Sequence, residues 1–238
     1  MQLVLWDFDG TLAYRQGGMW VATLLDILGE FAPNLCVTAE QVRPYFQPGA
    51  YQPGFPWHTP EQPHAHIRSA DEWWSALNPL FEHVFREVGV GIEYAKELAA
   101  LMRVHYADPA QWRLFNDAMP ILTQLSEQGF THALLSNHVP ELPELLETLE
   151  LLPFFVYVFN SAQTGYEKPH PQAFQNVREA FPQANIVCMI GDNLHSDIAG
   201  AEAAAIPGIL VRTNDASVRH CCKDLTTVPA VIQHILTE

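Results

Sequence analysis

Cysteine is scarce in this chain. Its 238 residues include only four cysteines, Cys36, Cys188, Cys221 and Cys222, and none of them forms a C-x-x-C pair. Nothing in this spacing indicates a disulfide framework or a zinc site. The scarcity predicts a protein of a reducing compartment, and the cytoplasm fits best. The sequence suggests no role for the adjacent residues Cys221 and Cys222.

Basic residues and long apolar runs are also in short supply. Lys and Arg together number 12 against 27 Asp and Glu, which gives a formal net charge of −15. Such a charge argues against nucleic acid as a partner, because that binding relies on a general field of basic residues. We find no signal peptide and no apolar run that could cross a bilayer, so no membrane partner is expected. A ligand that carries phosphate would need a local positive site.

Apolar residues, in contrast, make up 48% of the chain. This content allows a packed core in one large domain, or in one domain that carries a smaller one. The stretch from about Tyr14 to Leu114 has mostly helical spacing, apart from Pro44 to Pro63, where Pro, Gly and aromatic residues exclude a regular helix. The helices predicted in this stretch are Met19–Leu28, Glu72–Val88 and Ile92–Tyr106.

The rest of the chain alternates between strand-like and helix-like segments. This alternation predicts an α/β fold with a doubly wound parallel sheet that helices cover on both faces. Ligands of such sheets bind outside the carboxyl ends of the strands. The predicted strands are Leu3–Leu5, Ala133–Leu135, Phe155–Phe159, Ile186–Ile190 and Ile209–Val211, and the predicted helices are Met119–Gln128, Glu141–Leu149, one that starts at Pro171, and Ser196–Ala204.

Polar residues lie at or just beyond the ends of four predicted strands. Because the carboxyl ends of parallel strands share one edge of the sheet, these side chains should converge there. Gly10 permits a tight turn close behind the first strand. The polar residues are Asp7 and Asp9 after the first strand, Ser136 and Asn137 after the second, Lys168 in the loop after the third, and Asp192 and Asp197 after the fourth.

This set of side chains suits the transfer of a phosphoryl group. Carboxylates gathered around one point repel each other unless a cation joins them, and oxygen-rich acidic sites suit Mg²⁺. Asp7 could attack phosphorus to form an aspartyl-phosphate, while Asp9 could protonate the departing alkoxide and then activate water. The Lys168 ammonium and the Ser136 hydroxyl could hold phosphate oxygens.

The same motifs, in the same order, resemble those of the haloacid dehalogenase superfamily. They are Asp7-Phe8-Asp9-Gly10-Thr11, Leu135-Ser136-Asn137, Lys168-Pro169 and Gly191-Asp192-Asn193-Leu194-His195-Ser196-Asp197. The match looks closest to members that resemble phosphoglycolate phosphatase. The resemblance implies a Rossmann-like catalytic core of residues 1–14 and 115–238, with a helical cap of residues 15–114 inserted after the first motif.

The resemblance also implies a role for each motif residue. Asp7 matches the nucleophile and Asp9 the general acid and base. The Mg²⁺ ligands would be Asp7, the backbone carbonyl of Asp9 and Asp192, with Asp197 supporting the water shell of the metal. Ser136, Asn137 and Lys168 fall at the phosphate-binding positions. Family members that cleave carbon–halogen bonds generally lack an acid at the position of Asp9, so this chain resembles the phosphatases.

Two positions depart from the common family pattern. Many members have Asn where this chain has Ser196, which could cap the helix that follows. Many also have Gly where this chain has Ala205, so the geometry of that turn is open.

The sequence leaves the reaction and the substrate partly open. A phosphatase acting on a small phosphorylated metabolite is the main hypothesis. A phosphomutase of the same fold and a non-catalytic binding protein are the alternatives. Specificity would lie in the cap, where His58, His64 and His66 form no convincing second metal site because no acid or Cys completes a ligand set. Neither the oligomeric state nor the residues that select the substrate follow from the sequence.

Overall fold

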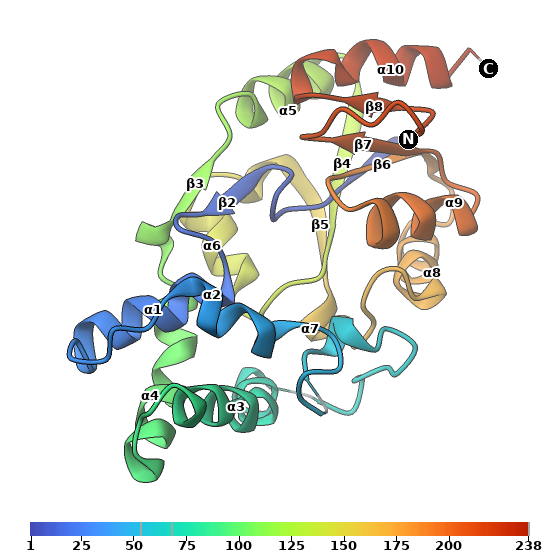
Figure 1. The fold of residues 1–238 in the computed structure, drawn as a ribbon. Coiled ribbons are helices and arrows are strands. Elements are labelled where there is room, and N and C mark those ends of the chain that lie inside the picture. The colour runs from blue at the N-terminus through green and yellow to red at the C-terminus, as the bar shows by residue number, and fades with distance from the viewer. Residues whose placement is uncertain (53, 68, 238) are drawn as a thin grey trace.

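The computed structural model describes residues 1–52, 54–67 and 69–237. Its central element is a six-stranded parallel sheet (Figure 1). The strand order is β5-β4-β1-β6-β7-β8, so β1 is central and the chain later builds outward on both sides of it. This reversal of direction beside β1 creates the crevice in which α/β sheets bind ligands. The strands are β1 (Gln2–Trp6), β4 (Phe130–Ser136), β5 (Phe155–Asn160), β6 (Asn185–Gly191), β7 (Gly208–Val211) and β8 (Cys221–Cys222).

Both faces of the central strands β1, β4 and β6 are buried, as the sequence predicted. Successive side chains of a strand point to opposite faces, so Leu3 and Leu5 of β1 pack with Phe174 of α8, while Val4 and Trp6 lie in a second apolar cluster. That second cluster includes side chains of α5 and α10. The helices that follow the strands are α5 (Ala118–Glu127), α6 (Leu142–Thr148), α7 (Ser161–Thr164), α8 (Pro171–Ala180), α9 (Gly200–Ala203) and α10 (Val228–Ile235).

The stretch between β1 and α5 is mainly helical and lies beyond the carboxyl edge of the sheet, at the bottom of Figure 1. Two short antiparallel strands, β2 (Ala13–Arg15) and β3 (Trp112–Leu114), carry the chain out of the sheet region and back. The helices are α1 (Trp20–Phe31), α2 (Ala39–Val42), α3 (Ala70–Glu87) and α4 (Ile92–Tyr106), with 3₁₀ turns at Arg43–Phe46, Pro56–His58 and Pro109–Gln111. The division into a core and a cap at residues 14 and 115 stays a prediction.

Aromatic side chains fill the centre of this helical part. The Trp20 ring stacks on Tyr106 with ring centroids 4.0 Å apart, and it also contacts Phe55 and Phe81. The same apolar cluster continues without a break into the side chains of β1. The predicted irregular stretch therefore contributes to the core, because its aromatic residues pack against the helices on either side.

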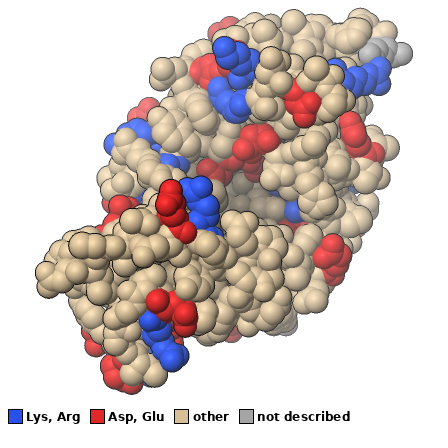
Figure 2. Space-filling model, viewed as in Figure 1, with Lys and Arg blue, Asp and Glu red and all other residues tan. Residues whose placement is uncertain are grey.

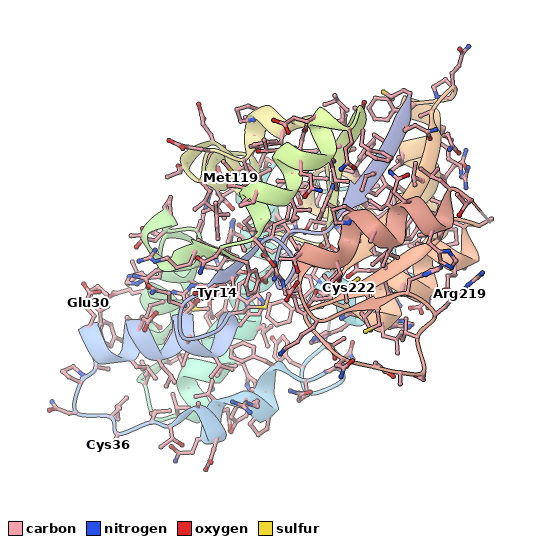
Figure 3. The ribbon with its side chains drawn as sticks, turned by 90° about the horizontal axis from the view of Figure 1, so that it is seen from above. Tyr14, Glu30, Cys36, Met119, Arg219 and Cys222 are labelled. Carbon is pink, nitrogen blue, oxygen red and sulfur yellow. The ribbon has the colours of Figure 1, made fainter. Side chains whose placement is uncertain are left out.

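Short elements were the ones that the sequence analysis missed. The ribbon of β2 and β3 and the edge strand β8 have only two or three residues each, too few to show a periodic pattern. Cys221 and Cys222, which had no assigned role, form β8 and pair with β7. All four cysteines are free, and Figure 3 shows Cys36 far from Cys222, on the helical part of the molecule.

The predicted helix Ser196–Ala204 is wrong in its start and in its winding. A π-helical turn spans Leu194–Ala199 and α9 follows it. The cap is Asn193 and not Ser196, because the Asn193 side-chain oxygen accepts hydrogen bonds from the backbone N–H groups of His195 and Ser196. No helix in the described part of the chain is both long and apolar enough to cross a membrane.

Candidate active site

The polar residues predicted at the strand ends converge at one edge of the sheet. Asp7 directly follows β1, Ser136 ends β4, and Asp192 directly follows β6. The backbone N–H of Asp7 donates to Ile190 O at 2.9 Å, which holds the ends of β1 and β6 together. Figure 2 shows a hollow in the middle of the molecule with acidic atoms on its upper wall.

Asp7 is the centre of a buried hydrogen-bonded group. Its Oδ1 accepts a hydrogen bond from Ser136 Oγ at 2.9 Å and another from Lys168 Nζ at 2.7 Å. Lys168 Nζ also donates to Asp197 Oδ1 at 2.6 Å. Burial alone would lower the pKa of Lys168, but the carboxylates of Asp197 and Asp7 raise it above its usual value. The ammonium therefore stays charged beside the predicted nucleophile.

Asn137 positions the loop that carries Lys168. Its side-chain Nδ2 donates to Lys168 O at 2.9 Å, and its Oδ1 accepts from the Lys168 backbone N–H at 2.7 Å. Both ends of the amide are engaged by one residue, which fixes where the lysine side chain starts. Asn137 also lines the cavity that opens in front of Asp7 and Asp192. Its contact with phosphate stays a prediction.

Asp9 lies in the turn after β1, where its carboxyl group is poised to hold a proton. Burial, and after it the carboxylates of Asp7 and Asp192, raise the pKa of Asp9 to about 8. The turn depends on Gly10, whose φ is +80° and whose missing Cβ would lie 2.3 Å from Asp192 Oδ2. Only glycine combines this backbone angle with so close an approach.

Three carboxylates form a cluster that fits a small divalent cation. Asp7, Asp192 and Asp197 each offer one oxygen, and these atoms lie within 4.8 Å of one another. Burial and the neighbouring carboxylates raise the pKa of both Asp192 and Asp197, although Lys168 opposes the rise. Such mutual repulsion among oxygen ligands is relieved by a hard cation such as Mg²⁺. Asp197 is the more constrained member, since its Oδ2 accepts from the Asn193 backbone N–H at 3.0 Å.

The three histidines next to the motifs behave differently. His138 is buried and lines the cavity, and His195 lines it as well. His170 instead caps α8, where its Nδ1 accepts a hydrogen bond from the Gln172 backbone N–H. Only the first two are therefore placed to meet a ligand.

A cavity of about 430 Å³ opens in front of the carboxylates. Its size falls within the range of small-molecule sites. The sequence analysis did not single out Met19, Tyr106 or Val139 as lining residues, because nothing in their local sequence marks them. The apolar and aromatic part of the lining, which we call the aromatic wall, consists of Met19, Trp20, Trp57 and Tyr106 from the helical part, with His138 and Val139 from the loop after β4.

Comparison with known proteins agrees with the geometry. Over 139 residues the chain is 33% identical to a phosphoserine phosphatase of Thermus thermophilus, a match that covers 56% of this chain and 55% of that protein. Over 134 residues it is 30% identical to a glyceraldehyde 3-phosphate phosphatase of Pyrococcus abyssi, covering 55% of this chain and 56% of that protein. The chain thus spans about half the length of these curated relatives.

The fold as a whole has solved counterparts. The Bacillus subtilis hydrolase YfnB, in a crystal form bound to magnesium, matches 98% of both chains with a TM-score of 0.71 and 22% identity. The family model of haloacid dehalogenase-like hydrolases matches residues 1–205. The protein therefore belongs to the haloacid dehalogenase-like hydrolases.

Proposed function

We propose that this protein is a Mg²⁺-dependent phosphatase that hydrolyses the phosphomonoester of a small metabolite through an aspartyl-phosphate. The observation that carries the proposal is the pairing of two acids with different environments. Asp7 accepts hydrogen bonds from the Lys168 ammonium and the Ser136 hydroxyl. Asp9, two residues further along, has a pKa raised to about 8 and keeps its proton at neutral pH. One is equipped to attack and the other to donate a proton.

Asp7, the backbone carbonyl of Asp9 and Asp192 would hold the cation, with Asp197 beside them. A bound Mg²⁺ would supply charge that offsets both the phosphate and the carboxylates. Lys168 and Ser136 supply the remaining donors for phosphate oxygens.

The protein side chains account for the movement of protons. The Asp7 carboxylate attacks phosphorus, the bond to the ester oxygen breaks, and the Asp9 carboxyl gives its proton to the departing alkoxide. The Asp9 carboxylate then takes a proton from the water that attacks the aspartyl-phosphate, which releases phosphate and restores Asp7.

The similarity to curated phosphatases and the free cysteines support the rest of the proposal. The names of these relatives describe phosphatases of small phosphorylated molecules. The four cysteines are free, which suits a cytoplasmic enzyme. A phosphomutase with the same acids would return the phosphoryl group to a sugar. Analysis of the products separates the two, because a mutase forms an isomer and a phosphatase releases free phosphate.

Replacement of the nucleophile tests the proposal directly. Asp7→Asn should lower phosphate release with Mg²⁺ by about a thousandfold or more, because the amide cannot attack phosphorus. Asp215→Asn, at a residue outside the cavity lining, makes the same chemical change as a control. Full activity in Asp7→Asn would contradict the mechanism, and a lack of turnover by the unmodified protein on any phosphate ester would favour a binding protein.

A further inference from the structure

The aromatic wall of the cavity carries no Lys or Arg side chain among the described residues. It consists of Met19, Trp20, Trp57, Tyr106, His138 and Val139. The one cation in the described lining of the whole cavity is Lys168, which Asp7 and Asp197 already engage. A substrate that enters with its phosphate toward Lys168 therefore places its other end against an aromatic surface without positive charge.

Arg15 and Arg43 do not supply a cation to this wall. Arg15 is buried, and its terminal nitrogens donate to the Asp26 carboxylate and to the backbone carbonyls of Gly18 and His105. Arg43 is exposed on its 3₁₀ turn and does not line the cavity. Arg68 lies outside the described residues.

Two polar side chains of the wall have hydrogen-bonding atoms without a partner. Trp20 is 7% exposed and His138 is 2% exposed. Within the described part of the chain, Trp20 Nε1 and both ring nitrogens of His138 find no hydrogen-bond partner. A buried polar group without a partner costs free energy, so such groups at a cavity point to a ligand that satisfies them.

The charge state of His138 agrees with this picture. Burial lowers the pKa of His138 to about 4, although the Val139 backbone and Asp7 act in the opposite direction. Its ring also packs edge-on against Phe8 at 5.4 Å between centroids and lies 5.2 Å from the Trp112 ring. A neutral imidazole offers one donor and one acceptor, and the indole of Trp20 adds a donor.

We propose, building on the phosphatase function above, that the alcohol released by this enzyme is uncharged and bears hydroxyl or carbonyl groups, as a polyol or sugar does. The aromatic faces cover its carbon skeleton, while Trp20 Nε1 and the His138 ring bond to its oxygens. A carboxylate in the same place would lose its hydration against aromatic faces, with no Lys or Arg side chain of the described wall to balance its charge, and its binding would be weaker.

A matched pair of substrates tests the proposal. Glycerol phosphate and phosphoglycerate share one carbon skeleton and differ in a neutral hydroxymethyl group against a carboxylate. We expect kcat/KM to be about tenfold or more higher for glycerol phosphate, the equivalent of about 1.4 kcal/mol in transition-state binding. An equal or higher value for phosphoglycerate would overturn the proposal. Failure to hydrolyse these esters and p-nitrophenyl phosphate alike would instead refute the phosphatase function itself.

A cation placed in the wall should change this preference. Met19 is 39% exposed, so its position can accommodate a longer side chain. Met19→Arg should raise kcat/KM for phosphoglycerate relative to glycerol phosphate by roughly fivefold to tenfold, as a partly exposed ion pair forms. Met19→Gln, of similar length and without charge, is the matched control and should not shift the ratio. An unchanged ratio in Met19→Arg would contradict the position assigned to the leaving group.

The hydrogen bond from Trp20 has its own test. Trp20→Phe keeps an aromatic face and removes Nε1. We expect kcat/KM to fall roughly threefold to tenfold for glycerol phosphate and to stay near its starting value for propyl phosphate, which lacks the hydroxyls. An equal fall for both esters would show that Trp20 acts only through packing. Preference for phosphoglycerate that disappears in Arg43→Gln would assign the leaving group to an arginine at the rim and overturn the proposal.

Discussion

The two walls of the cavity differ in chemistry, because one is charged and hydrogen-bonded and the other is aromatic. The wall at the sheet edge gathers carboxylates and one buried lysine, joined by hydrogen bonds of 2.6 to 2.9 Å. The aromatic wall contains the stacked rings of Trp20 and Tyr106, and among the described residues Trp20 Nε1 and the ring nitrogens of His138 have no hydrogen-bond partner. The first wall holds like charges together at a cost in stability, whereas the second belongs to the core of the protein. Reaction and stability are therefore assigned to different walls.

The largest effect on stability is expected at the aromatic wall. Trp20→Ala removes the ring that stacks on Tyr106 and contacts Phe55 and Phe81. We expect the free energy of unfolding to fall by about 3–5 kcal/mol, because the deletion leaves a cavity in a packed cluster. Urea unfolding followed by circular dichroism measures it. A loss below about 1 kcal/mol would place Trp20 outside the stabilising core.

The contact where the two regions meet should respond to pH. His64, which directly follows the irregular stretch, donates its backbone N–H to Gly165 O at 2.9 Å, and its Nε2 lies 3.7 Å from Glu167 Oε1. Gly165 is required there, since a Cβ on it would come within 2.3 Å of Ala65 Cα. Burial raises the pKa of Glu167 to about 8, so in the folded protein this carboxyl is neutral over a range of pH in which it ionises in the unfolded chain.

The sign of that linkage is a loss of stability as pH rises. Below the unfolded value of about 4.5 both states are protonated, and between there and about pH 8 the unfolded state releases the proton more readily. Glu167→Gln removes this dependence. Relative to the variant, the unmodified protein should lose on the order of 3 kcal/mol between about pH 5 and about pH 9. Glu93→Gln, at an exposed helical position, is the control, and parallel pH curves for Glu167→Gln and the unmodified protein would contradict the assignment.

A smaller effect of opposite direction is expected at the acidic wall. Without metal, Asp192→Asn should raise the free energy of unfolding by about 0.5–1 kcal/mol, because it removes one of three repelling carboxylates and water already screens the exposed side chain. With Mg²⁺ the unmodified protein should become the more stable of the two, since the cation binds the folded state. Thermal unfolding in EDTA and in Mg²⁺ shows whether the order reverses, and no reversal would remove Asp192 from the metal site.

A stability effect as small as that of Asp192→Asn is expected outside both walls. Ala205 has φ of +54°, a left-handed conformation, at the position where many family members have glycine. Ala205→Gly should raise the free energy of unfolding by about 0.5–1 kcal/mol with no change in substrate preference, because glycine adopts this conformation without strain. A decrease in stability would mean that the Ala205 methyl group contributes more through packing than it costs in backbone strain.

The sequence predicted the two walls unequally. Each residue of the acidic wall directly follows a strand or lies in the next loop, and a parallel sheet necessarily brings such positions to one edge. Asp7, Ser136 and Asp192 could therefore be placed together from the order of strands and loops alone. Met19 and Tyr106 come from the two ends of the helical part, and they meet only because of the angles at which α1 and α4 pack, which apolar periodicity does not determine.

The sequence analysis missed other features because they are short or depend on a single side chain. The strands β2, β3 and β8 are too short to show alternation. The π-helical turn after Asp192 depends on the Asn193 side chain, which caps it with two hydrogen bonds. Such local hydrogen-bonding choices compete with ordinary helix formation, and the spacing of apolar residues carries no information about them.

The ribbon of β2 and β3 has a mechanical consequence. The chain leaves the sheet region through one of these strands and returns through the other, so they are the sole covalent links to residues 16–111. Two further backbone hydrogen bonds, Gln16 to Gln111 and Phe115 to Leu12, extend the pairing at its two ends. At the sheet end, Arg212 binds both the Asp117 carboxylate and the Thr11 carbonyl and lies 3.8 Å above the Phe115 ring.

Paired strands resist stretching and bend with difficulty in their own plane, but they twist readily. Rotation of the helical part against the sheet would therefore twist this ribbon, whose sheet end Arg212 holds in place. The ribbon would then favour a turning motion of the helical part over a sliding one.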